Sequence, residues 1–280
     1  MAGIQVVTDS ACDLTKETAE DRDIQIVPLK IRFGSEEFFD REELSTKEFW
    51  DRVITGPLIP ETAAPSPGAF QRVFLEAADQ GRTGVLCITL SSRLSATYQA
   101  ASTAAEAVAG RIQVRVVDSL TVTVGEGLLV LSAVDIAEEN KSVDEIVTIL
   151  EDLMSRTRVY GLLESLDFLR RGGRIGGAAH LMGSLLSIKP VLEVREGIVE
   201  VESKQRTRQR SLRYLASKAL EAGPLERLAI ANGAAKDVGE LQEMLNGADV
   251  AHEIVMTDLG PVIGSHAGPG AIGVCFQLAH

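Results

Sequence analysis

The amino-acid sequence predicts an α/β protein made of two α/β domains, with a ligand site between them. Runs rich in β-branched residues alternate with runs of helical periodicity along the 280 residues, a pattern typical of helices packed on a largely parallel sheet. A long helical stretch ends near residues 156–160, where a second α/β series begins. We therefore expect an N-terminal domain over residues 1–158 and a C-terminal domain over residues 159–280. Ligands of such proteins bind between domains and at the carboxyl ends of strands.

Short apolar runs between turn signals give the expected strands. In chain order these are Ile4–Thr8, Ile26–Phe33, Gly84–Leu90, Ile112–Val117, Val159–Leu163, Ile188–Val194, Ile198–Ser203, Arg227–Ala231, Val250–Met256 and Ala271–Phe276. Longer amphipathic runs give the expected helices. These are Lys16–Glu20, Thr46–Ile54, Gly68–Gln80, Ser95–Ala109, Val124–Asn140, Val143–Arg156, Leu166–Arg171, Thr207–Ala222 and Ala235–Leu245.

Composition and charge exclude several classes of protein. The formal net charge of −12 argues against non-specific binding to DNA or RNA, which needs a basic surface. No apolar run is long enough to span a membrane, and the first residues, MAGIQVVTDSACDL, lack a leader-type pattern. We therefore expect a cytoplasmic protein without stable membrane insertion. The three cysteines are far apart, so neither a disulfide framework nor a zinc site is indicated.

A serine-rich turn is the most informative segment of the chain. In Val85–Ala101, an apolar run stops at Ser91-Ser92 and a helical run begins near Ser95. Such a turn combines hydroxyls with free backbone N–H groups and the positive end of a helix dipole, which suits an anion. Ser95 could also be an ordinary helix cap, and a nucleophilic serine would normally come with a G-x-S-x-G elbow that is absent here.

Thr62, Arg174 and His266 are further candidates for contact with an anion. Thr62 lies in the Pro-rich segment Gly56–Gly68, Arg174 follows a double glycine, and His266 lies in the Gly-rich segment Gly264–Gly270, which we expect to be a loop. An arginine held by the backbone and a histidine can both donate hydrogen bonds to an anion. Taken singly, each could equally be an ordinary loop or surface residue.

Two further features have simpler interpretations. Asp9 and Asp118 each end an expected strand and precede a serine; without a wider acidic cluster they indicate turn capping more than a metal ion. The basic segment Lys204–Arg213 should place Arg206, Arg210 and Arg213 near one helix face. That face could bind phosphate or an acidic partner, or simply be solvated.

Taken together, and in this order, the motifs of the chain resemble those of the DegV family, which includes the bacterial FakB proteins. The matching motifs are TDS-x-x-DL at Thr8–Leu14, P-x-T at Pro60–Thr62 followed by PSPG, SS-x-LS-x-TYQ-A at Ser91–Ala100, VDS at Val117–Ser119, L-x-x-GGRI at Leu169–Ile175, LL-x-IKP at Leu185–Pro190, and H-x-GPGA at His266–Ala271.

This resemblance implies a DegV-like fold and a fatty-acid-binding protein that is not itself an enzyme. Such a protein sequesters a long-chain fatty acid and presents its carboxylate to a partner fatty acid kinase, whose acyl phosphate product enters phospholipid synthesis. By the resemblance, the carboxylate would be held by Thr62 and Ser95, with Arg174, His266 and Ser92 close by. No metal ion or cofactor is expected, and the bound fatty acid is the ligand. Leu162–Leu169 and Leu181–Ile188 are candidate walls for its tail.

The chain departs from the family pattern at two places. Ala63-Ala64 follows Thr62 where the family has Ser-Gln, and Ala96 follows Ser95 where the family has glycine. We expect the first change to remove one hydrogen bond to the head group and the second to crowd the turn slightly. The alternative function is a serine-dependent acyl hydrolase or transferase that uses Ser95 with His266 as its base. A DNA-binding regulator is disfavoured by the acidic charge balance.

Overall fold

The computed structural model describes residues 3–139, 141–181 and 188–280. Its first sheet is parallel throughout and has the strand order β2–β1–β6–β7. The strands are β2 (Ile24–Val27), β1 (Ile4–Asp9), β6 (Gly84–Thr89) and β7 (Val114–Asp118). Every residue of β6 is buried, as expected for a central strand covered on both faces.

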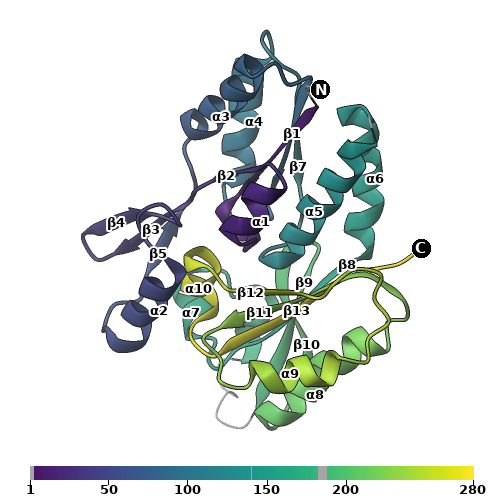
Figure 1. Ribbon diagram of the computed structural model, residues 1–280. Helices are drawn as coiled ribbons and strands as arrows, with labels where there is room; N and C mark the ends of the chain where they lie inside the picture. Colours follow the sequence, from purple (N-terminus) through teal and green to yellow (C-terminus); the bar gives the residue numbers. More distant parts are fainter. Residues whose placement is uncertain (1–2, 140, 182–187) are drawn as a thin grey trace.

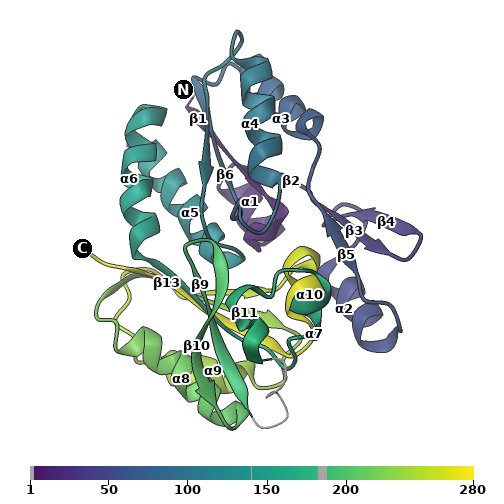
Figure 2. The same cartoon turned by 180° about the vertical axis from the view of Figure 1, so that it is seen from behind.

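Helices cover both faces of this sheet (Figures 1 and 2). On one face, α3 (Pro67–Asp79) and α4 (Thr97–Val108) pack on the apolar side chains of the strands. The other face is covered by α1 (Lys16–Asp21), α5 (Val124–Glu138) and α6 (Val143–Arg156). Helix α5 is apolar all round and almost wholly buried, because it also packs against strands of the second sheet.

The second sheet has the strand order β10–β9–β8–β13–β11–β12. Its strands are β10 (Ile198–Gln205), β9 (Lys189–Arg195), β8 (Thr157–Leu162), β13 (Ala271–Leu278), β11 (Leu225–Gly233) and β12 (Val255–Asp258). Only β11 and β12 pair in parallel, so the expectation of largely parallel strands is wrong for this half. Strands β9 and β10 form a hairpin around Glu196 and Gly197, whose φ angles of 48° and 81° suit a turn that reverses the chain.

The two faces of the second sheet have different partners. The outer face packs on α8 (Arg208–Leu220) and α9 (Val238–Leu245). The inner face turns toward the first domain and shares a core with Leu90, Val124 and Leu128. The expected boundary at residue 158 falls inside β8, the first strand of this sheet; that boundary stays a prediction.

A small three-stranded sheet and one helix project from the side of the molecule (Figure 1). This β-arm consists of β4 (Glu36–Phe39), β3 (Lys30–Phe33) and β5 (Glu61–Ala63), with α2 (Thr46–Thr55) beside them. The expected single strand Ile26–Phe33 is wrong: it is divided between β2 and β3 at Pro28-Leu29, because proline cannot donate to the sheet ladder. Strands β4 and β5 were not expected from the sequence.

Three short helices complete the fold and lie around the inner face of the second sheet. They are α7 (Asp167–Arg171), the 3-10 segment η2 (Gly176–Leu181) and α10 (Pro261–Ala267). Among the residues described, no helix combines the length and the apolar character needed to cross a membrane. Cys12, Cys87 and Cys275 are buried and unpaired.

Candidate functional site

A pocket opens between the inner face of the second sheet and elements that come before β8 in the chain. It encloses about 940 Å³ of space free of protein atoms, part of it open to solvent. Its lining is largely aliphatic. The apolar side chains of the wall include Leu29, Leu90, Leu94, Val122, Val159, Leu163, Leu169, Leu192, Val194, Val199, Ala231, Leu259, Val262, Ile263, Ala267, Ala271 and Ile272.

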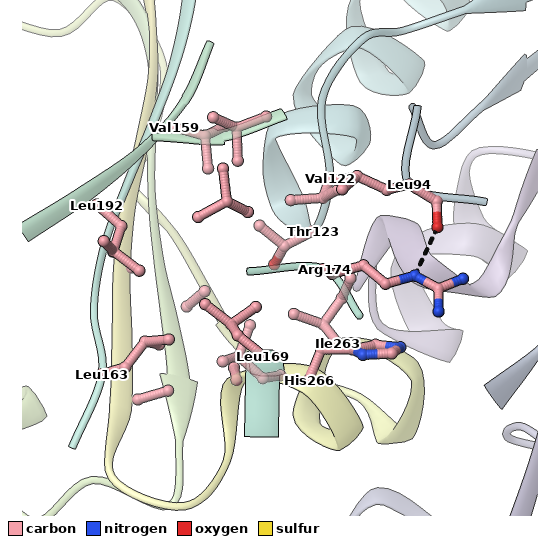
Figure 3. Close-up of a pocket in the computed structure, with 18 of the residues that line it drawn as sticks. Leu94, Val122, Thr123, Val159, Leu163, Leu169, Arg174, Leu192, Ile263 and His266 are labelled. Atoms are coloured by element: carbon pink, nitrogen blue, oxygen red, sulfur yellow. Dashed lines mark hydrogen bonds between the residues drawn. The ribbon is translucent and has the colours of Figure 1, made fainter. Parts of the chain in front are cut away.

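Four of the five predicted site residues line this pocket: Thr62, Ser95, Arg174 and His266. They come from β5, from the turn before α4, from the segment after α7, and from α10. Figure 3 shows Arg174 and His266 on one side of the pocket and Val159, Leu163 and Leu192 on the opposite side. The pocket therefore has a polar end and an apolar end.

Thr62 and His266 form a direct pair. Oγ1 of Thr62 lies 2.9 Å from Nε2 of His266. Burial and the charge of Arg174 lower the pKa of His266 to about 4, so its imidazole is neutral near pH 7 and one ring nitrogen carries the proton. When Nε2 donates to Thr62, the hydroxyl proton of Thr62 is left to donate to an anion in the pocket.

Arg174 is fixed by two backbone carbonyl groups. Its Nε donates to the carbonyl oxygen of Leu94 at 2.9 Å, and its Nη1 donates to that of Gly172 at 2.5 Å. The Leu94 bond joins the segment after α7 to the turn that carries Ser95 (Figure 3). A side chain at Gly172 would meet Nδ1 of His266 at 2.2 Å, so the glycine at this position lets His266 pack against the backbone just before Arg174.

Ser95 is close to the position expected from the sequence, but it is not the first helical residue. Helix α4 begins at Thr97, and Ala96 at its N-cap provides no side-chain hydrogen bond. The Ser95 hydroxyl lies 2.8 Å from that of Thr97. The Ser95 hydroxyl also accepts the backbone N–H of Thr97 at 3.4 Å, so Ser95 lies directly at the N-terminal turn of α4, where the helix dipole favours an anion.

Ser92 lies outside the pocket. Its side chain is exposed, and its backbone N–H donates to the Asp118 carboxylate at 2.9 Å. The chain turns between Ser92 and Ser95, so that only Ser95 faces the cavity. The structure thus does not bring Ser92 to the other four residues.

The strand-end aspartates cap turns, in agreement with the sequence-based interpretation. Asp9 accepts hydrogen bonds from the N–H groups of Ala11 and Leu90, both at 2.9 Å, and Asp118 accepts from Ser92 and Leu120. Within residues 3–139, 141–181 and 188–280, no three His, Cys, Asp or Glu side chains are arranged to hold a metal ion.

The segment that carries His266 is a helix and not the expected loop. Helix α10 starts at Pro261 in the first turn and ends before Gly268, whose φ is 73°. Proline early and glycine just after the end is a recognised helix signature, and it could have identified α10 from the sequence. The indole Nε1 of Trp50 in α2 donates to the carbonyl of Leu259 at 3.0 Å, which fixes the approach to this helix.

The expected walls of the tail site are tested only in part. Leu163 and Leu169, from the predicted segment Leu162–Leu169, line the pocket. The other predicted wall, Leu181–Ile188, lies almost entirely outside the described residues. Sequence reasoning missed Thr123, which contributes to the lining, and the Leu94 carbonyl, which holds Arg174.

The basic segment lies outside the pocket lining. Thr207 caps α8, with its hydroxyl accepting from the N–H of Arg210. Arg206, Arg210 and Arg213 are exposed, whereas Arg208 is paired with Asp237 and Glu164. Three arginines of this segment therefore face solvent.

Comparison with known proteins finds relatives that cover nearly the whole chain. A DegV-domain-containing protein of Deinococcus radiodurans is 35% identical over 279 residues, and one of Listeria innocua is 32% identical over 279 residues; each alignment covers 98% of both chains. A solved DegV family structure from Thermus thermophilus, described as showing fatty acid binding, has 34% identity and a TM-score of 0.91 over 99% of this chain and 100% of its own.

A second solved structure is DegV from Bacillus subtilis, described as a fatty acid binding protein. It has 29% identity and a TM-score of 0.88 over 100% of both chains. The family model described as "uncharacterised protein, DegV family" matches residues 3–279. Because this match covers nearly the whole length and the fold agrees with the solved members, the chain belongs to the DegV family.

Proposed function

We propose that the protein binds one long-chain fatty acid, with its carboxylate at Thr62, Ser95, Arg174 and His266 and its tail in the apolar part of the pocket. The observation that carries this proposal is a cavity with hydroxyl, guanidinium and imidazole groups at one end and a largely aliphatic lining elsewhere. Relatives described as fatty acid binding support it: the proteins from Thermus thermophilus and Bacillus subtilis, and a stearic-acid-binding protein from Eubacterium ventriosum.

The chemistry of the polar end suits a carboxylate. A fatty acid is ionised at neutral pH, so its head group needs donors in a site shielded from water. Arg174 supplies positive charge, and the hydroxyls of Thr62 and Ser95 can each donate one hydrogen bond. The tail gains roughly 0.8 kcal/mol per buried methylene, so about a dozen contribute on the order of 10 kcal/mol before the costs of association.

The same geometry gives no support to a hydrolase. The Ser95 hydroxyl is bonded to Thr97, and His266 is bonded to Thr62. A serine nucleophile needs a hydrogen bond to its base and a third group that orients the base. With its pKa lowered to about 4, His266 is also a weak base.

We further propose that this protein is a cytoplasmic carrier and that a partner fatty acid kinase performs the chemistry. The exposed Arg206, Arg210 and Arg213 are the proposed contact for the kinase or its nucleotide, because a cationic surface on an acidic protein favours an anionic partner. In this assignment the bound fatty acid is the only ligand and neither a cofactor nor a metal ion takes part.

The proposal is tested by looking for fatty acid bound to the purified protein. Protein purified from a bacterial host is extracted with organic solvent, and the extract is quantified by mass spectrometry. We expect long-chain fatty acids at a near-stoichiometric level. A control in which Thr62→Ala and Ser95→Ala are combined should retain less. An extract of the unchanged protein without fatty acid, together with no uptake of added fatty acid, would refute the proposal.

A further inference from the structure

Asp13 is a fully buried carboxylate at the junction of the two domains. It follows the short 3-10 segment η1 (Ser10–Cys12) and has a φ of 51°. Its Oδ1 accepts the backbone N–H of Gly260 at 2.9 Å, and its Oδ2 accepts the hydroxyl of Thr123 at 2.7 Å. The hydroxyl of Thr257 donates to its backbone carbonyl. Asp13 is thus hydrogen-bonded both to the start of α5 and to the segment before α10.

The bond to Gly260 fixes where α10 begins. Gly260 is the N-cap of this helix, with φ −69° and ψ 172°, angles that any residue adopts. Backbone conformation therefore does not require glycine at this position. A Cβ atom there would lie only 2.8 Å from Oδ1 of Asp13, so glycine is needed because the carboxylate packs directly against the backbone.

The bond to Thr123 holds a strained residue in the pocket wall. Thr123 has φ 53° and ψ −151°, which is a genuine outlier for a β-branched residue. Such conformations persist only where surrounding contacts determine them, and they occur preferentially at functional sites. Thr123 lines the pocket, and its hydroxyl is bonded to Asp13.

Arg41 is the cation that faces Asp13, although burial still raises the pKa of Asp13 to about 7. Nη2 of Arg41 lies 3.9 Å from Oδ1 of Asp13, and the guanidinium also donates to the carbonyl groups of Ser10 and Leu14. Arg41 belongs to the connection between β4 and α2, on the same β-arm that carries Thr62. The junction therefore ties together the first domain, the β-arm and α10.

We propose that Asp13 is a positioning residue for the fatty-acid site: through Gly260 it holds α10 so that His266 meets Thr62, and through Thr123 it holds the neighbouring wall. This inference rests on the proposed function. The two bonds have separate consequences. Loss of the Gly260 bond displaces the head-group residues, whereas loss of the Thr123 bond alters only the wall.

The test compares a fatty acid with an alcohol of the same length. Affinities for tetradecanoate and tetradecan-1-ol are measured by competition against a fluorescent fatty acid. Gly260→Ala is expected to raise the dissociation constant of tetradecanoate about tenfold or more, because it disturbs the hydrogen bonds that hold the charged head group. The dissociation constant of the alcohol should change little. Asp13→Ala removes both bonds, so it is expected to weaken the binding of tetradecanoate to a similar extent and, because the wall is altered as well, also to weaken the binding of the alcohol. Thr123→Val is expected to leave the acid-to-alcohol ratio unchanged.

Gly239→Ala is the matched control, because Gly239 is an exposed glycine of α9 with no atom within 4 Å of a built Cβ. Circular dichroism and thermal unfolding identify any variant that fails to fold. If Asp13→Ala does not fold, Gly260→Ala carries the test. A folded Gly260→Ala with the wild-type acid-to-alcohol ratio overturns the positioning role alone. Wild-type protein that binds neither compound overturns the proposed function as well.

Discussion

The hydroxyl oxygen of Thr62 lies 2.9 Å from Nε2 of His266, although the two residues are 204 positions apart in the sequence. Thr62 comes from the β-arm, where it pairs with Ile31 of β3, and His266 comes from α10. Their contact closes the polar end of the pocket. It also gives both residues a defined orientation before any ligand enters, which lowers the cost of ordering them on binding.

Replacing Thr62 with valine should weaken the binding of fatty acids specifically. The change keeps the shape of the side chain and removes the hydroxyl that we expect to donate to the carboxylate. A hydrogen bond to a charged group contributes about 1.5–3 kcal/mol, so the dissociation constant should rise roughly tenfold to a hundredfold. Isothermal titration with a fatty acid and the matching alcohol checks this. Equal losses for both ligands would place the carboxylate elsewhere.

The imidazole of His266 should stay neutral across the physiological pH range. Burial and Arg174 lower its pKa to about 4, so its ring resonances should not titrate between pH of about 5 and 8. NMR of ¹³C- or ¹⁵N-labelled histidine measures this directly, with His266→Gln providing the assignment. A midpoint near 6.5 for His266 would contradict the prediction.

The protein should not hydrolyse acyl esters through Ser95. Its hydroxyl is bonded to Thr97 and not to a histidine, so the activated nucleophile of a serine hydrolase is missing. Turnover of p-nitrophenyl esters is expected to be the same for the wild type and for Ser95→Ala. Ester hydrolysis that disappears in the variant would restore the hydrolase interpretation.

Reversing the charge of Arg206 and Arg210 to glutamate should impair phosphorylation of the bound fatty acid by the kinase of the host bacterium. Both side chains are exposed on the surface, so fatty acid affinity should be unchanged. Acyl phosphate formation is measured with the kinase and ATP, at low and raised salt, because surface charge effects are screened by salt. Arg72→Glu with Arg111→Glu, two exposed arginines of the first domain, is the charge-matched control. Equal rates for both double variants would exclude this contact.

Asp40→Asn should change how stability depends on pH. Burial raises the pKa of Asp40 from 3.8 to about 6. The folded chain therefore binds this proton more tightly than the unfolded chain, and folding loses stability as pH rises from about 4 to about 6. The difference corresponds to about 3 kcal/mol at most.

Urea unfolding of the wild type and of Asp40→Asn, at pH values of about 4 and about 8, measures this effect. The variant should gain stability relative to the wild type as pH rises. A difference in unfolding free energy that does not change with pH would contradict the assignment of this titration to Asp40.

Much of the first domain could be predicted from the sequence. Strands such as β6 are short apolar runs between clear turn signals, and helices such as α3 begin with a serine cap and a proline, both strong local signals. The relative direction of neighbouring strands could not be predicted. An apolar run has the same composition whether its neighbour is parallel or antiparallel, so the sequence does not reveal that most strands of the second sheet pair antiparallel.

The sequence pointed to four residues that meet in one pocket, but their arrangement in space could not be predicted from it. Thr62, Ser95, Arg174 and His266 each stand in a motif, and the structure brings all four to one pocket. Ser92 belongs to the same motif as Ser95, but the chain reverses between them. Asp13 also lies in a motif, yet its partners Thr123 and Gly260 are more than a hundred residues away. Only the tertiary fold reveals that contact.

The chain has a single tryptophan, and its indole donates to the carbonyl of Leu259 immediately before α10. Trp50 is buried, and its ring would collide with any side chain placed at Gly264 within the helix. Tryptophan fluorescence therefore comes from Trp50 alone, which lies beside α10, the helix that carries His266. A fatty acid that shifts α10 on binding should therefore change the emission of Trp50, and stopped-flow fluorescence would follow its arrival without an added dye.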